Sequence, residues 1–138
     1  MTRYSFNFVD FKIISINFSL TGKSPQEIDI KPSLEFRHEK NKNELKVYLG
    51  INYENPKAPF VFNIKGAGLF EFENDISKED LEEVANINCA AILYPFLRET
   101  LADITRRSGL PPLLLPPLNF INLYKVLKKE RELAQQEH

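Results

Sequence analysis

The apolar residues of this 138-residue chain change their spacing once, near residue 74. Before that point they alternate with polar residues, as in β-strands, and after it they recur every three or four positions, as in helices. Strands grouped ahead of helices are typical of α+β proteins, because α/β proteins interleave the two. We therefore predict an α+β fold: a four-stranded antiparallel sheet followed by a long kinked helix and a second amphipathic helix.

The four predicted strands lie in runs bounded by turn residues. They cover residues 11–20, 27–38, 44–54 and 58–73. The last run carries Gly66 and Gly68 on the same face as its phenylalanines, and glycine inside a strand marks a bulge or a close approach of another backbone. Because the turns between the runs are short, the spacing favours a meander in which each strand pairs with the next.

The long helix is predicted over residues 78–107. Ser77 and Asp80 fit a capping box at its start, and Gly109 fits the position just past its end. Pro95 lacks an N–H group and is expected to kink the helix. Between about 87 and 97 the helix is apolar on nearly all sides. One sheet covers only one of them, so we expect a second copy of the chain to cover the other.

Composition excludes several classes of protein. The net charge of −1 argues against a nucleic-acid binder. Neither a signal peptide nor an apolar run long enough for a membrane helix is visible, which predicts a cytoplasmic protein without membrane insertion. Cys89, His38 and His138 are scattered, so we predict no metal site. No acid–base constellation suggests an enzyme, and no motif suggests a cofactor. One domain, residues 1–138, is expected for this length.

Residues 88–124 carry the most specific signal. They read NCAAILYPFLRETLADITRRSGLPPLLLPPLNFINLY, and the earlier stretch at 59–70 reads PFVFNIKGAGLF. The first stretch resembles the carboxyl half of the SecB family, and the second resembles that family's last strand. The resemblance implies a tetramer built as a dimer of dimers, with the long helices at the interface. It also implies an ATP-independent holdase that binds unfolded preproteins and keeps them competent for export, with the SecA motor as a partner.

The resemblance places two sets of site residues on this chain. The groove that binds unfolded clients is expected at Ile30, Phe60, Phe62, Ile64, Leu118, Phe120 and Tyr124. The oligomer interface is expected at Ile87, Cys89, Ala91, Leu93, Tyr94, Phe96 and Leu97. For the groove residues, membership in the ordinary core of the fold is the alternative. Cys89 is expected to be a buried structural cysteine, because no base can be placed beside it.

The sequence departs from the SecB family at the surface that docks the motor. The positions that correspond to acidic residues, and to one aliphatic residue, are Ser15, Ser19, Val61 and Asn63. Only the aliphatic one is kept, at Val61. Losing three carboxylates weakens electrostatic docking onto a basic patch. A solitary SecB-like chaperone, attached to a toxin–antitoxin pair, fits this loss better than a SecA partner does.

Two functions of different classes follow. The first is a general holdase. The second is a protein that reuses the scaffold to bind one dedicated partner, such as an antitoxin, or one small apolar ligand, since fold does not fix function. Binding of several unrelated unfolded clients indicates the first. One saturable ligand without any effect on aggregation indicates the second.

Overall fold

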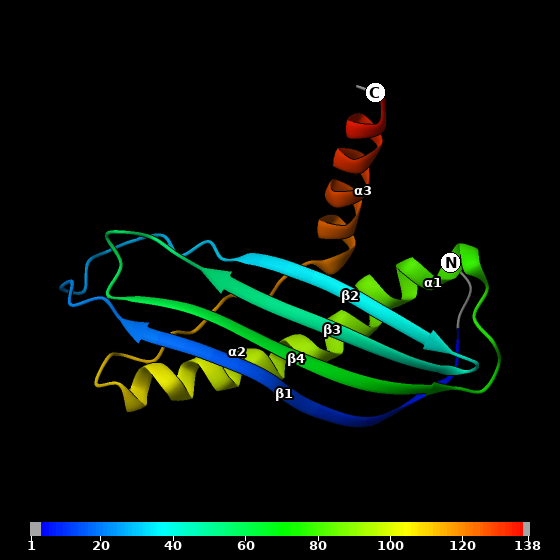
Figure 1. The fold of residues 1–138 in the computed structure, drawn as a ribbon, viewed down its shortest axis with the longest axis horizontal. Helices are drawn as coiled ribbons and strands as arrows, with labels where there is room; N and C mark the ends of the chain where they lie inside the picture. Colours follow the sequence, from blue (N-terminus) through cyan, green and yellow to red (C-terminus); the bar gives the residue numbers. More distant parts are fainter. Residues whose placement is uncertain (1–3, 137–138) are drawn as a thin grey trace.

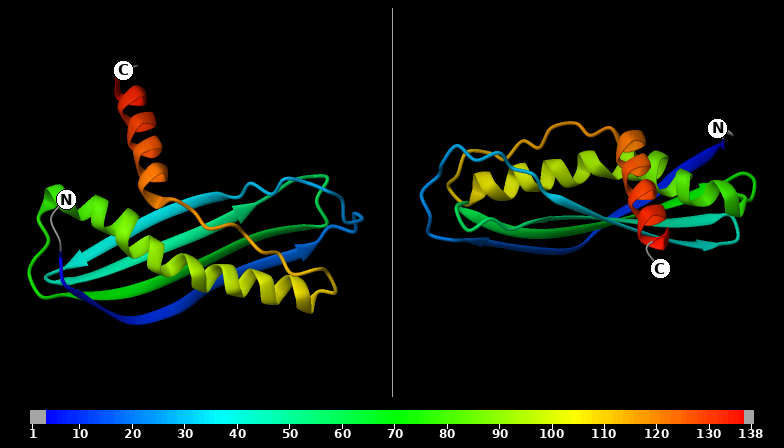
Figure 2. Two further views of the ribbon diagram at one scale, coloured as in Figure 1. Left: turned by 180° about the vertical axis from the view of Figure 1, so that it is seen from behind. Right: turned by 90° about the horizontal axis from the view of Figure 1, so that it is seen from above.

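The computed structural model describes residues 4–136 as one antiparallel sheet with a long joined helix along one face and a last helix that projects from one edge (Figures 1 and 2). The strands are β1 (Phe6–Leu20), β2 (Ser33–Asn41), β3 (Glu44–Tyr53) and β4 (Phe60–Phe72). The helices are α1 (Lys78–Glu83), a π-helical segment η1 (Val84–Cys89), α2 (Ala90–Arg107) and α3 (Phe120–Gln136). The prediction of a four-stranded antiparallel sheet followed by a long joined helix and a second helix is confirmed.

The order of the strands is β1-β4-β3-β2, so the predicted meander is wrong for the first strand. β2, β3 and β4 pair in sequence, whereas β1 lies at the opposite edge beside β4. The connection at residues 21–32 must therefore cross from one edge of the sheet to the other (Figure 1). Much of the second strand candidate, residues 27–32, belongs to this connection, and β2 begins only at Ser33.

The apolar face of the sheet carries the core. The side chains that alternate along β3 are all buried on this face: Leu45, Val47, Leu49, Ile51 and Tyr53. Gly66 and Gly68 pair with Leu49 and Val47 in the register of β3 and β4. A Cβ at Gly66 would lie 2.8 Å from the Phe11 ring of β1 and 3.1 Å from Leu97 Cδ2, and one at Gly68 would collide with Leu93. The atoms that approach the two glycines are therefore side chains of α2 and β1, and not another backbone.

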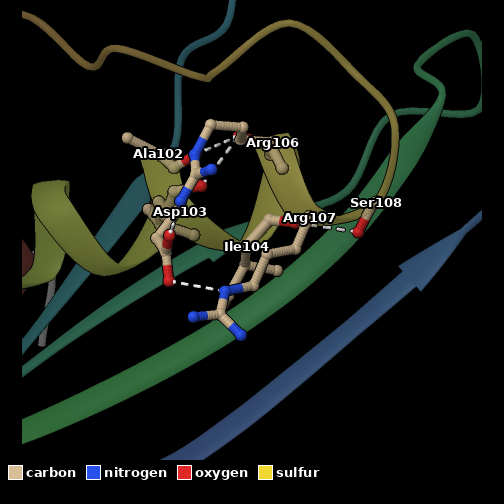
Figure 3. Close-up of polar contacts among 8 residues, drawn as sticks. Ala102, Asp103, Ile104, Arg106, Arg107 and Ser108 are labelled. Atoms are coloured by element: carbon tan, nitrogen blue, oxygen red, sulfur yellow. Dashed lines mark hydrogen bonds and ion pairs between the residues drawn. The ribbon is translucent and has the colours of Figure 1, made fainter.

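The helical region begins and ends as predicted. Ser77 caps α1 by accepting a hydrogen bond from the Asp80 N–H. Gly109 follows α2 with a φ of 82°, a left-handed conformation that glycine adopts without strain. The last turn of α2 holds a polar cluster, in which Arg106 and Arg107 both pair with Asp103 (Figure 3). The hydrogen bond from Arg106 holds the pKa of the Asp103 carboxyl below its usual value.

The sequence did not predict the π-helical turn at η1, which lies ahead of Pro95. Pro95 itself lies inside α2. Its ring removes the N–H that would bond to the carbonyl of Ala91, and both residues are exposed, so water can reach that carbonyl. The joined helix bends along its length (Figure 2), as helices do at π-turns and prolines.

A proline-rich strap, residues 110–119, connects α2 to α3 across the apolar face. Thr105 accepts a hydrogen bond from the Leu113 N–H at 2.8 Å, and the Tyr94 hydroxyl donates one to the Pro116 carbonyl at 2.7 Å. Leu115 is buried between these two anchors. The strap fixes the start of α3, whose remaining length projects from the β2 side of the sheet (Figure 1).

Candidate functional site

The three predicted groove residues on β4 are part of the hydrophobic core. Phe60, Phe62 and Ile64 are all buried. The Tyr53 ring stacks on the Phe62 ring with centroids 5.7 Å apart and meets the Phe60 ring edge-on at 5.8 Å. These three side chains therefore belong to the core that supports this face, and they do not form a surface that a client could contact directly.

The predicted groove residues near the second helix fix the base of α3. Phe120 meets the Tyr94 ring at 5.6 Å and the Phe36 ring at 6.4 Å, both edge-on, and is buried. Tyr124 is buried one turn later, and this burial raises the pKa of its hydroxyl. Leu118 is half-buried at the end of the strap. The ring contacts of Phe120 thus hold the first turn of α3 against β2 and α2.

Ile30 lies half-buried in the connection between β1 and β2, where it lines a small apolar pocket of about 180 Å³. The strap and the β3–β4 loop supply the other walls. Tyr53 also lines this pocket, and its buried hydroxyl has no hydrogen-bond partner among residues 4–136. The pocket is about the size of a cavity that holds one benzene ring, so it fits a single apolar side chain.

A larger groove lies between β2 and α3, and the groove prediction did not include it. We refer to it as the β2–α3 groove. It has a volume of about 610 Å³ and is lined by Leu34, Phe36, Arg37, His38, Glu82, Asn86, Leu127, Glu130, Arg131 and Ala134. Its floor is apolar and half-buried, and its rim is charged. The alternation of Leu34 and Phe36 was visible in the sequence, but the position of α3 beside them was not.

Most of the predicted oligomer-interface residues are already buried within the chain. Leu93 and Leu97 face the glycines of β4, and Tyr94 holds the strap. Ile87 and Cys89 are buried as well. Only two of the seven residues reach the surface: Ala91 and Phe96.

Phe96 is the centre of an exposed apolar area. Its side chain is 39% exposed, and its ring stacks on the Phe11 ring at 4.8 Å and lies 5.8 Å from the Phe8 ring. Phe8 on the neighbouring edge strand β1 is exposed as well, and Ile16 and Leu20, further along β1, are exposed on the same face of the sheet. Ile14 is exposed on the opposite face, beside Lys12 and Lys46. Exposed apolar side chains grouped as Phe8 and Phe96 are typical of interaction surfaces.

The predicted partner-docking residues share the face of the sheet opposite the helices. Ser15 pairs with Lys65, and Ser19 pairs with Val61. Asn63 lies between Asn17 and Asn52 in the register and donates a hydrogen bond to the Asn52 side chain. Ser19, Val61 and Asn63 line a shallow hollow of about 620 Å³ on this face. At Ser19 and Asn63 the hollow presents a hydroxyl and an amide where the resemblance leads one to expect carboxylates, while Lys31, Glu35 and Glu54 supply the charges of its lining.

The residues considered for chemistry do not form a reactive site. Cys89 is buried, and burial raises the pKa of its thiol to about 12, which leaves it protonated at neutral pH. Among residues 4–136 no three His, Cys, Asp or Glu side chains lie close enough to hold a metal. His138 lies outside these residues. No helix in the same range is long and apolar enough to cross a membrane.

Comparison with known proteins decides the family. A family profile described as preprotein translocase subunit SecB matches residues 9–131. The chain belongs to the SecB family. The protein-export protein SecB of Bradyrhizobium diazoefficiens is 33% identical over 121 residues, which cover 88% of this chain and 65% of that protein. The protein-export protein SecB of Methylobacillus flagellatus is 36% identical over 78 residues, covering 56% of this chain and 49% of that protein.

A solved SecB-like structure shares the fold. It is the SecB-like chaperone of Mycobacterium tuberculosis in complex with a ChAD peptide from the HigA1 antitoxin, with a TM-score of 0.68 and 21% identity. The match covers 82% of this chain and 87% of that chain. This SecB-family chain spans about half to two thirds of the length of the first curated relatives it matches. The SecB-family relatives point to a non-enzymatic chaperone.

Proposed function

We propose that this protein is an ATP-independent holdase that binds unfolded or newly made polypeptides in the cytoplasm and keeps them competent for export. The observation that carries the proposal is the β2–α3 groove, an open groove with an apolar floor and a charged rim in a chain of the SecB family. Burying apolar surface contributes roughly 25 cal/mol per Å². A few hundred Å² of client contact therefore provides several kcal/mol without any dependence on sequence.

The surface for clients extends beyond this groove. Ile30 and the small apolar pocket beside Tyr53 supply a second contact, and Leu118 lies at the end of the strap. Phe60, Phe62, Ile64, Phe120 and Tyr124 support these contacts from within the core. In this proposal the buried residues predicted from the sequence support the groove from the core, and side chains on β2 and α3 form the surface that clients contact.

The working form is proposed to be a homo-oligomer, a tetramer built as a dimer of dimers. The apolar area around Phe96 and Ala91 supports self-association, because a monomer would leave this area in water. The residues buried beneath it, among them Leu93 and Leu97, support the interface from the inside.

A dedicated partner is the second candidate function. Ser15, Ser19 and Asn63 stand where the resemblance leads one to expect carboxylates on a surface that docks SecA, and the acidic residues of this face, Glu35 and Glu54, lie at other positions. The related chaperone from Mycobacterium tuberculosis was solved with an antitoxin peptide. Both observations favour a solitary chaperone serving one antitoxin over one coupled to SecA.

One experiment tests the holdase against the dedicated binder. Aggregation of several chemically unfolded proteins is followed by light scattering, with wild type and with Leu127→Asp, which places a charge in the groove. Val126→Asp is the matched control, because Val126 is 55% exposed and does not line the groove. Protection by wild type and by the control, but not by Leu127→Asp, supports the holdase. Failure of wild type to protect any client rejects it.

A further inference from the structure

The face of the sheet opposite α2 carries three lysines that lie close together. Lys12 on β1 pairs with Ala67 on β4, and Lys65, two residues from Ala67, is its diagonal neighbour. Diagonal neighbours in a sheet lie about 7–8 Å apart. Lys46 on β3 belongs to the same area, because it lines one hollow together with Lys12. We refer to these three residues as the lysine patch. α2 and the strap lie on the other face of the sheet and leave it uncovered (Figure 2).

The hollow between Lys12 and Lys46 is small and has a largely apolar floor. It has a volume of about 200 Å³, and residues 67–69 of β4 lie between the two lysines. Ile14 lines it too and is 49% exposed. The second register shift of β1 falls at Ile14, and such bulges redirect a side chain. An exposed isoleucine beside a hollow of this size suits a single apolar side chain of a partner.

The positive charge of the lysine patch is not balanced by carboxylates of the chain. Among residues 4–136, Lys46 and Lys65 make no ion pair, and Lys12 lies 3.8 Å from Asp10. Glu39 pairs with Lys46 in the register of the strands, but it forms its ion pair along its own strand instead. The patch therefore offers two free amines to a negatively charged partner.

Carboxylates border the lysine patch and limit what can bind there. On the same face of the sheet, Glu44 and Glu71 pair with each other beyond one end of the patch. Beside Lys65, Glu35 lies across Gly50. A long polyanion such as a nucleic acid would run over these carboxylates and be repelled by them. A short acidic segment would meet only the lysines and the hollow.

We propose that the lysine patch docks a short acidic segment of a partner protein, which inserts one apolar side chain into the hollow beside Ile14. Exposed ion pairs contribute little each, so the apolar side chain supplies much of the affinity, and the lysines select and orient the segment. This inference goes beyond the proposed function. The floor of the β2–α3 groove, with Phe36, belongs to the other face of the sheet, so a client and this partner can bind together.

Binding of designed peptides to wild-type protein is the first test. A fluorescent peptide with one leucine between two blocks of three glutamates is titrated and followed by anisotropy. Two comparison peptides carry lysines in place of the glutamates, or serine in place of the leucine. We expect the lysine peptide to bind at least about tenfold more weakly than the parent, and the serine peptide about threefold more weakly. Raising salt from about 50 mM to about 500 mM should also weaken the parent, because the ion pairs are exposed.

A pair of charge-reversed variants locates the binding surface. Lys46→Glu combined with Lys65→Glu reverses two charges of the patch. Lys125→Glu combined with Lys128→Glu is the matched control, because it changes the net charge equally at exposed positions of α3. We expect the patch variant to lose at least about tenfold in affinity for the acidic peptide, and the control less than about twofold. Should the patch variant fail to fold, Lys12→Gln with Lys46→Gln, at two exposed positions, replaces it and should lose about threefold.

Several outcomes would overturn the inference. Equal binding of the acidic and lysine peptides, or equal loss in the patch variant and the control, means that the patch does not select an acidic segment. Binding of oligothymidine more tightly than the acidic peptide, lost in the patch variant, assigns the surface to a nucleic acid. Self-association that the patch variant abolishes assigns it to a second copy of the chain.

The same measurements separate this inference from the proposed holdase. If wild type binds the acidic peptide through the patch but protects no unfolded client from aggregation, the holdase is wrong and the docking surface stands. If wild type protects clients but binds no acidic peptide, the docking surface is wrong and the holdase stands.

Discussion

Leu93 occupies the space into which a side chain at Gly68 would project, so that the Leu93 side chain of α2 packs against the backbone of β4 at this position. Replacing Gly68 with alanine would force the fully buried Leu93 to move. Inserting one methyl group into a packed core costs about 1–3 kcal/mol. We therefore expect Gly68→Ala to lower the free energy of unfolding, measured by urea denaturation, by that amount.

The control for this change is Gly50→Ala on β3. A Cβ at Gly50 would lie 3.4 Å from the Cβ of Glu35, an ordinary contact. This variant should lose less stability than Gly68→Ala, because the added methyl group, although buried, meets its neighbours at ordinary contact distances. Equal loss of stability in both variants would mean that the strand, and not the approach of α2, determines the need for glycine.

The glycines illustrate what the sequence could predict. Their position on an apolar strand face indicated a close approach, whereas the resemblance placed Leu93 and Leu97 at the oligomer interface, so the side chains that approach the glycines were not predicted. The cap at Ser77 and the stop at Gly109 could be predicted from the local sequence. Each of these features depends on residues within a few positions of one another.

The features that sequence reasoning missed are non-local. Nothing near residues 21–32 indicates that β1 lies beside β4, because this pairing depends on the whole sheet. The β2–α3 groove was missed for the same reason, because Phe36 and Leu127, which both line it, lie on elements far apart in the chain. Resemblance to the SecB family placed the client residues on β4, where the structure buries them. The periodicity of apolar residues can be recognised in the sequence, whereas the exposure of a side chain can be determined only once the fold is packed.

The hydroxyl of Thr105 anchors the strap, and its removal should loosen the connection between α2 and α3. Thr105→Val keeps the shape but leaves the partly buried Leu113 N–H without its acceptor. Leaving a buried donor unpaired costs about 1–3 kcal/mol, and we expect the free energy of unfolding to fall toward the lower end of that range because water reaches part of this site. Amide hydrogen exchange at Leu113 should also accelerate.

Thr100→Val is the matched control for this change. Thr100 donates a similar hydrogen bond one turn back, to the Phe96 carbonyl at 2.9 Å, but it is not an acceptor for the strap and that bond is exposed. Its loss should change stability by less than about 0.5 kcal/mol. If Thr105→Val exchanges and unfolds like the control, the strap is held by Tyr94 and by packing alone.

The buried thiol of Cys89 predicts a specific loss of stability at alkaline pH. Burial raises its pKa from the ordinary value of 9.0 to about 12. Between these values the unfolded chain has lost the thiol proton while the folded chain keeps it, so stability falls as pH rises. The contribution is fully present below pH 9.0 and is lost toward pH 12, at up to about 1.4 kcal/mol per pH unit.

Comparison with Cys89→Ala isolates this contribution, because all other groups titrate alike in both proteins. The stability advantage of wild type over the variant should shrink between pH 9 and pH 11 in urea denaturation. Folded wild type should also resist alkylation of its thiol at pH 8. Rapid labelling of the folded protein, or a constant difference in stability across this range, would mean that Cys89 is accessible to solvent.

Phe96 provides the test of self-association. Phe96→Glu places a charge on the exposed apolar area formed with β1, where a second copy is proposed to pack. A charge buried without a partner at an interface costs several kcal/mol, so sedimentation should show a smaller species at micromolar concentration. Leu133→Glu, at a similarly exposed position on α3, is the control and should sediment like wild type. If Phe96→Glu sediments with the same mass as wild type and unfolds at the same urea concentration, the area around Phe96 lies outside the interface.

If instead both wild type and variant sediment as monomers, the proposed oligomer does not form through any surface of this chain.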